Sequence, residues 1–189
     1  MNELYNALLM GLGTALINET EQLRDGKQTI DEWQLAFLAI LARYYNAALM
    51  LGADSFELTK QQVDFVTSSV QEQDGYLANF GKDIEKGWDD KFLARSEMYA
   101  SSMTPVYWKG ATWDLKLPAQ PGEGSECLVF CKCMWDIVWV DRTKGDANCY
   151  WALGESEHCP TCILRANEWS PILVRNGKHD AKAINMVGS

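Results

Sequence analysis

Positive charge is scarce in this chain, which has 17 Lys and Arg residues against 26 Asp and Glu residues and a formal net charge of −9. Affinity for nucleic acid depends mainly on clustered Lys and Arg side chains that neutralise phosphates. No basic run interleaved with aromatic residues is present. The composition therefore predicts no direct binding to nucleic acid, and an acidic surface that keeps the protein in solution.

Long hydrophobic runs are also missing. The most apolar stretch, residues 35–51, is interrupted by Arg43 and two tyrosines, whereas a membrane span needs about 20 apolar residues. The opening Met-Asn-Glu-Leu carries an acid where a secretory signal carries basic residues. We therefore expect no membrane association and synthesis in a cytoplasm, where cysteines stay reduced.

Catalytic patterns are not evident either. The sequence has two histidines and lacks the Gly-x-Ser-x-Gly, P-loop and Rossmann glycine patterns. A zinc hydrolase or deaminase needs an open metal position beside an acid–base carboxylate; Glu155 and Glu157 are the nearby candidates. Cys159-Pro-Thr-Cys162 resembles a thioredoxin-type redox motif, but the 27 residues after it carry no matching strand and helix pattern. We expect no catalytic residues and no enzyme.

What the chain does have is six cysteines, five of them in two groups. The first group is Cys127-Leu-Val-Phe-Cys131-Lys-Cys133, and the second is His158-Cys159-Pro-Thr-Cys162. Two short-range sulfur pairs separated by roughly two dozen residues are typical of a structural zinc site. The predicted ligands are Cys131, Cys133, Cys159 and Cys162, with Cys127 and His158 as alternatives. Cys149 lies mid-strand and is expected to be a small core residue. Paired disulfides are the alternative reading.

Residues 1–105 are predicted to form a helical module. A first helix from Asn2 ends before the Asp25-Gly26 turn, and a fourth is expected from Asp89 to Met103, ended before Pro105. Two capping boxes, Thr29-Ile-Asp-Glu32 and Thr59-Lys-Gln-Gln62, open the helices between them. The third helix carries a heptad-like seam that packs within the chain or against neighbouring subunits: Val63, Val66, Val70, Leu77, Phe80 and Ile84.

Residues 106–125 are predicted to be an extended aromatic arm, 107–117, followed by a linker, 118–125. Residues 126–189 form a zinc-knuckle hairpin module with strands over 134–140 and 149–153, two helical turns over 162–169 and a tail from 177. The predicted fold class is therefore α+β: an N-terminal helical bundle with long helices, and a C-terminal β-hairpin closed by a zinc knuckle.

Two segments resemble a known family. They are Cys127–Trp135 and the run Tyr150-Trp-Ala-Leu-Gly154 continued by Glu-Ser-Glu-His158-Cys159-Pro-Thr-Cys162 and closed by Trp169-Ser-Pro171. They are similar to the C-terminal portion of tailed-bacteriophage head-morphogenesis, or minor head, proteins. The helices ending in Ala94-Arg-Ser-Glu-Met-Tyr99 are similar to the helical part of the same family.

This resemblance implies a non-enzymatic structural virion protein, made in the host bacterial cytoplasm and incorporated during viral head assembly. Its implied partners are other virion proteins, namely portal, capsid or neck subunits, in a homo-oligomer or few-copy assembly, as for a minor capsid protein. The implied cofactor is a structural Zn²⁺ held by Cys131, Cys133, Cys159 and Cys162. A cytosolic zinc-dependent enzyme of hydrolase or deaminase type and a non-enzymatic zinc adaptor are the alternative functions.

Overall fold

The computed structural model describes residues 3–127, 131–155 and 157–179. The chain has an α+β fold, with long helices in its N-terminal part and an antiparallel sheet in its C-terminal part. It divides into two compact units, Met1–Tyr107 and Trp108–Ser189. This division lies close to the end of the predicted helical module at residue 105, and each unit is described by itself.

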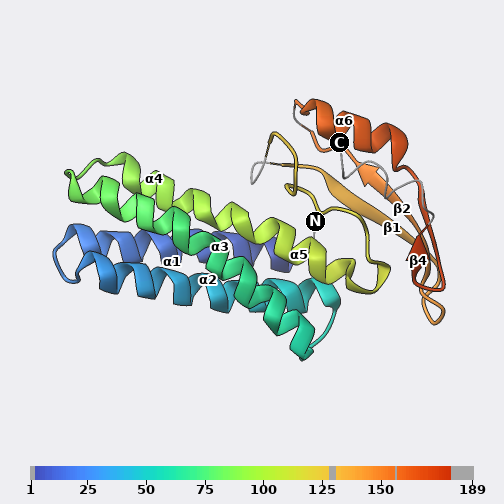
Figure 1. Ribbon diagram of the computed structural model, residues 1–189, viewed down its shortest axis with the longest axis horizontal. Helices are drawn as coiled ribbons and strands as arrows, with labels where there is room; N and C mark the ends of the chain where they lie inside the picture. The colour runs from blue at the N-terminus through green and yellow to red at the C-terminus, as the bar shows by residue number, and fades with distance from the viewer. Residues whose placement is uncertain (1–2, 128–130, 156, 180–189) are drawn as a thin grey trace. The chain divides into compact units, whose positions relative to one another are not determined.

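The helical unit contains α1 (Glu3–Arg24), α2 (Ile30–Ala53), α3 (Lys60–Glu85) and α4 (Lys91–Met98). In Figure 1 these helices run alongside one another, with α2 in contact with α1 and α3, and α1 in contact with α4. Both predicted capping boxes are present: the side chains of Thr29 and Glu32, and of Thr59 and Gln62, satisfy each other's backbone amides. Asp54, in a left-handed conformation, ends α2 two residues beyond the expected Gly52.

Aromatic side chains fill the core of this unit. Trp33 meets Phe37 and Phe80 edge to face at ring-centre distances of 5.3 and 5.2 Å. A small polar network lies in the same core, where the Trp33 indole N–H donates to the Thr20 hydroxyl at 3.1 Å. Thr20 in turn bonds Ser96 across to α4 at 2.7 Å. This network fixes the register of α1, α2 and α4, because each buried polar group needs its partner.

The predicted seam on α3 is buried only in part. Val66, Leu77 and Phe80 are buried, but Val63 is 44% exposed, and Val70 and Ile84 are half-buried. The helix therefore uses one part of its apolar side for the core of its own unit, and leaves another part at the surface beside α2. Whether a neighbouring subunit covers that part stays a prediction.

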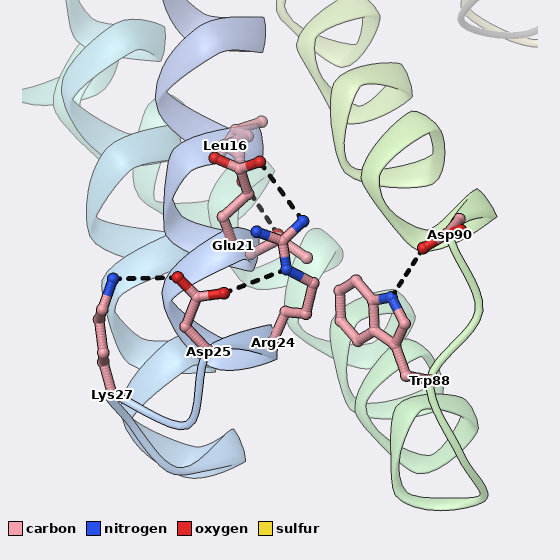
Figure 2. A network of polar contacts seen from close by, with 8 residues as sticks. Leu16, Glu21, Arg24, Asp25, Lys27, Trp88 and Asp90 are labelled. Atoms are coloured by element: carbon pink, nitrogen blue, oxygen red, sulfur yellow. Dashed lines mark hydrogen bonds and ion pairs between the residues drawn. The ribbon is translucent and has the colours of Figure 1, made fainter.

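Charged residues close the end of the unit where α1 turns into α2 (Figure 2). Asp25 forms ion pairs with Arg24 at 3.1 Å and with Lys27 at 3.0 Å, and Arg24 also pairs with Glu21 at 3.5 Å. At the turn before α4, the Trp88 indole N–H donates to Asp90 at 3.2 Å. These contacts lie at the surface, where solvent screens the charges, so they add little to stability.

Among the described residues, α2 is the one helix long and apolar enough to cross a membrane, with a mean hydropathy of 1.5 over its most apolar window. The core helix of a soluble protein passes the same test, and α2 buries six residues in its unit. Only 28% of the window is buried, however. The helix is thus more apolar than packing within this unit requires. The six buried residues are Trp33, Phe37, Leu41, Tyr45, Ala48 and Leu49.

The predicted extended arm is wrong. Residues 99–102 form a 3-10 turn, α5 spans Met103–Ala111, and a second 3-10 turn spans Trp113–Leu115. Pro105, predicted to end a helix, lies in the first turn of α5. Backbone amides of a first turn have no partner within the helix, so a proline is tolerated there.

The C-terminal unit is built on a four-stranded antiparallel sheet in the order β1-β2-β3-β4, rather than on the hairpin alone. Its strands are β1 (Met134–Asp141), β2 (Asp146–Ala152), β3 (Ile172–Arg175) and β4 (Lys178–His179), with α6 (Pro160–Glu168) before β3. The predicted hairpin is correct, with Trp135 opposite Trp151. The strands β3 and β4 were missed because four and two residues are too short for a visible alternation. Residues 180–189 of the expected tail lie outside the described residues.

Candidate metal centre

Three tryptophans form the core beside the cysteine groups. Trp135 comes from β1, Trp151 from β2 and Trp169 from the residue that ends α6. Trp151 meets Trp135 and Trp169 edge to face at 5.0 and 5.7 Å, and Trp135 stacks parallel to Trp169 at 6.1 Å. This cluster fixes α6 against the hairpin, and therefore fixes the start of α6 near the start of β1.

Arg165 and Trp135 hold the segment that precedes the first cysteine. The Arg165 guanidinium donates to the backbone carbonyls of Glu123 and Gly124 at 2.8 and 3.3 Å. The Trp135 indole N–H donates to the carbonyl of Ala119 at 3.1 Å. The predicted linker 118–125 is thus tied to both α6 and β1, and it delivers Cys127 to the same end of the unit.

The cysteines lie where the two structural elements begin. Cys131 and Cys133 come directly before β1, Cys159 is the N-cap of α6, and Cys162 lies in its first turn. Pro160 occupies the helix start, where its fixed backbone angle suits the first turn. The positive end of the helix dipole favours negative charge at this position, as a thiolate would supply.

Sulfur atoms from both groups lie at metal-binding distances. Cys127 Sγ is 3.4 Å from Cys159 Sγ and 3.7 Å from Cys162 Sγ, and Cys131 Sγ is 3.6 Å from Cys162 Sγ. A tetrahedral zinc ion with bonds of about 2.3 Å places its sulfur ligands about 3.8 Å apart, whereas a disulfide needs about 2.05 Å. All six cysteines are free thiols. The chain therefore folds into a cluster suited to a metal ion rather than into disulfides.

The second group also places an imidazole nitrogen beside one of the cysteines. Cys133 Sγ lies 4.0 Å from the Nδ1 atom of His158. Cys133 is 2% exposed, and His158 is half-buried. All six residues named from the sequence as ligands or alternative ligands are thus brought to one end of the unit. Which of them bind a metal stays a prediction.

The buried thiols are held in their neutral form when no cation is present. Contact with the Cys133 thiol, followed by burial, raises the pKa of Cys131. Burial, followed by contact with Cys159, raises the pKa of Cys162. Such raised pKa values mean that burial opposes negative charge at the site, and a bound divalent cation would reverse this effect by stabilising thiolates.

Glu126 is a feature of the site that the sequence reading missed. Hydrogen bonds from Cys159, and further from its own backbone and from Thr161, lower the pKa of the Glu126 carboxyl to about 2. Its carboxylate thus binds the N-terminal end of α6, beside two of the cysteines. The one feature of the sequence that points to Glu126 is its position directly before Cys127.

The remaining cysteine and the acidic candidates lie apart from this chemistry. Cys149 is fully buried in β2, and burial raises its pKa to about 11. This agrees with its expected place as a small core residue. Glu155 and Glu157 are exposed, and nothing described here assigns them a role as acid or base.

No protein-family model, curated protein or solved structure matches this chain, so the likeness to phage head-morphogenesis proteins rests on the motifs quoted above.

Proposed function

We propose that this chain is a non-enzymatic structural protein of a tailed-phage virion, with a structural zinc site in its C-terminal unit and a protein-docking surface on its helical unit. The observation that carries the proposal is the sulfur cluster at the start of β1 and α6. The cluster lies where β1 and α6 begin, beside the tryptophan core. A metal ion bound there would hold these two elements together, as structural metal sites do.

The zinc would stabilise a unit whose core is small. In such units the free energy of metal binding becomes free energy of folding. Cys131, Cys133 and Cys162 are at most 6% exposed, and Cys127, Cys159 and His158 are half-buried. Several sulfurs gathered in a mostly buried cluster are typical of structural zinc sites, whereas catalytic sites have three protein ligands and keep a position for water. Thiolate and imidazole ligands together favour zinc over the hard cations magnesium and calcium.

The helical unit offers two shallow grooves between α2 and α3. One, of about 190 Å³, is lined by side chains that include Ala42, Val63 and Val70. The other, of about 270 Å³, is lined by Leu35 and Leu38 together with Asp31, Gln34 and Asp74, and Leu35 is 70% exposed. Exposed apolar side chains gathered on one face are typical of protein-interaction sites. They support docking to other virion subunits, which the phage resemblance names as portal, capsid or neck proteins.

Assembly with head components tests the docking part of this proposal. The chain is co-expressed with the portal and capsid proteins of the same phage genome, and assembled particles are separated on a density gradient. We expect the chain to sediment with the particles, and Leu35→Asp and Val63→Asp to shift it to the unassembled fractions. Met10→Asp, at a 74% exposed position on α1, is the matched control and should sediment as the original chain does.

Zinc content tests the structural part. The purified chain is dialysed and its zinc is measured by mass spectrometry, before and after treatment with a strong chelator. We expect bound zinc that survives dialysis, and loss of near-ultraviolet tryptophan signals after chelation while the helical far-ultraviolet signal is largely kept. A chain without zinc, or one that remains at the top of the gradient in every co-expression, would contradict the corresponding part of the proposal.

A further inference from the structure

We propose that the cysteine cluster binds two zinc ions, with Cys131 and Cys162 as shared ligands between them. This inference rests on the zinc site proposed above and deepens it. The first ion would take Cys127 and Cys159 as its own ligands, and the second would take Cys133 and His158. The inference uses all six candidate ligands, where a single four-coordinate ion would leave two of them without a role.

The contacts among the six residues follow this division. Cys127 and Cys159 lie together at 3.4 Å, and Cys133 lies 4.0 Å from His158. Each pair joins a cysteine that precedes β1 to a residue at the start of α6: Cys127 to Cys159 through two sulfurs, and Cys133 to His158 through a sulfur and a nitrogen. We call these two pairs the ends of the cluster and assign one of them to each ion.

Cys162 and Cys131 connect the two ends. Cys162 lies 3.7 Å from Cys127 and 3.6 Å from Cys131, and it also contacts Cys159 and Cys133. Cys131 contacts Cys133 as well as Cys162. Cys162 therefore contacts members of both end pairs, as a bridging thiolate does. The sulfurs of Cys127, Cys131 and Cys162 all lie within 4.8 Å of one another, which brings Cys131 near both end pairs as well. Cys162 is fully buried and Cys131 is 6% exposed, whereas Cys127 and Cys159 at one end are half-buried.

Two ions also balance the charge of the full ligand set. With five thiolates and a neutral imidazole, two Zn²⁺ ions carry a net charge of about −1, the same as one Zn²⁺ held by three thiolates and an imidazole. The second ion therefore brings two further thiolates into coordination without adding net charge to a buried site.

Zinc stoichiometry of the intact chain is the test. Native mass spectrometry of the dialysed protein should show two zinc ions per chain. Cys133→Ser and His158→Asn each remove a ligand from one end only, so these variants should retain one ion. The control is Cys149→Ala, which changes the buried cysteine of β2 and should retain two.

Cadmium exchange gives a second measurement that does not depend on any variant folding. With cadmium in place of zinc, cadmium NMR of the unaltered chain should show two resonances, one for a site of four sulfurs and one for a site of three sulfurs and a nitrogen. The two signals should be split by coupling through the shared thiolates. One zinc per chain with a single cadmium resonance would overturn the two-ion inference and leave the single structural zinc intact. No zinc at all would overturn both.

Discussion

The guanidinium carbon of Arg165 lies 4.9 Å from the ring centre of Trp169 and 5.1 Å from the ring centre of Trp151, two rings that meet edge to face. The same guanidinium donates to two carbonyls of the segment before Cys127. Arg165 is 8% exposed, so its charge is satisfied inside the molecule by two aromatic faces and two backbone acceptors. Arg165 thus links the tryptophan core to the segment that leads into Cys127.

Arg165→Lys should destabilise the C-terminal unit by about 1–3 kcal/mol, because a lysine ammonium lacks the planar fork that contacts both tryptophan rings while bonding both carbonyls. The measurement is the urea midpoint followed by tryptophan fluorescence. Arg142→Lys is the matched control: Arg142 is exposed and lies over Trp139 at 5.2 Å, and its replacement should change stability by less than about 0.5 kcal/mol. Equal losses of stability in the two variants would show that the buried contacts of Arg165 contribute no more than those of an exposed arginine.

Thr20→Val should destabilise the helical unit by about 2–4 kcal/mol. Its hydroxyl receives the Trp33 indole N–H and bonds Ser96, and valine would leave both of those groups buried without that partner. The thermal midpoint measured by far-ultraviolet circular dichroism gives the result. Thr14→Val provides the comparison, since the Thr14 hydroxyl is exposed and bonds only back along its own helix to Met10. That variant should unfold at nearly the original temperature.

The elements with strong local signals could be predicted from sequence. The capping boxes at Thr29 and Thr59 place two helix starts to the residue, because a helix end has a defined chemistry of its own. The strand pair around Trp135 and Trp151 is visible because alternation repeats over seven or eight residues in each strand. Likewise, the spacing of the two cysteine groups indicates side chains that the fold brings close together.

The parts that were missed depend on contacts distant in sequence. Nothing local shows that Arg165 binds carbonyls more than 40 residues earlier, or that Ile172–Arg175 pairs with β2. The extended reading of 107–117 failed for a different reason, because Pro105 was taken as a stop when it lies in a first turn. The sequence also gives no local sign that the Cys127 sulfur lies 3.4 Å from the Cys159 sulfur. This short distance depends on the path that residues 118–127 take through the folded unit.

Acid should weaken the helical unit through Asp83. Hydrogen bonds from Arg95 and Lys86 lower the pKa of this carboxyl from its ordinary value of 3.8. Because the folded pKa lies below the unfolded one, the stabilisation is fully present above about pH 4. It is lost as the pH falls through the folded pKa.

Asp83→Asn should therefore lower the thermal midpoint at pH 7 and flatten its dependence on pH below about 4. Arg95 also lies over the Phe80 ring at 4.2 Å, so the cation would remain packed after its partner is neutralised. Asp64→Asn, at an exposed position on the same helix, is the control and should keep the original acid dependence. If the thermal midpoint of Asp83→Asn falls with acid as steeply as that of the original chain, this ion pair adds nothing to stability.

Gly154 has a structural reason to be glycine that links the end of β2 to the cysteine cluster. A Cβ atom at this position would lie 2.9 Å from the Cβ of Lys132 and 3.0 Å from its carbonyl carbon, distances that require the backbone to move. Lys132 is the residue between Cys131 and Cys133, so the displaced backbone would carry both sulfurs. Gly154→Ala should therefore weaken zinc retention as well as lower the stability of the C-terminal unit.

The measurement for Gly154→Ala is the rate at which a chromogenic chelator removes zinc, compared with the original chain. We expect removal to be at least several-fold faster. Gly75→Ala is the matched control, because Gly75 lies in α3 with no atom near its missing Cβ. There, alanine should stabilise the helix by about 0.5–1 kcal/mol and leave the rate unchanged. If zinc leaves Gly154→Ala at the original rate, the close approach to Lys132 does not position the sulfurs, and the cluster is held from the α6 side alone.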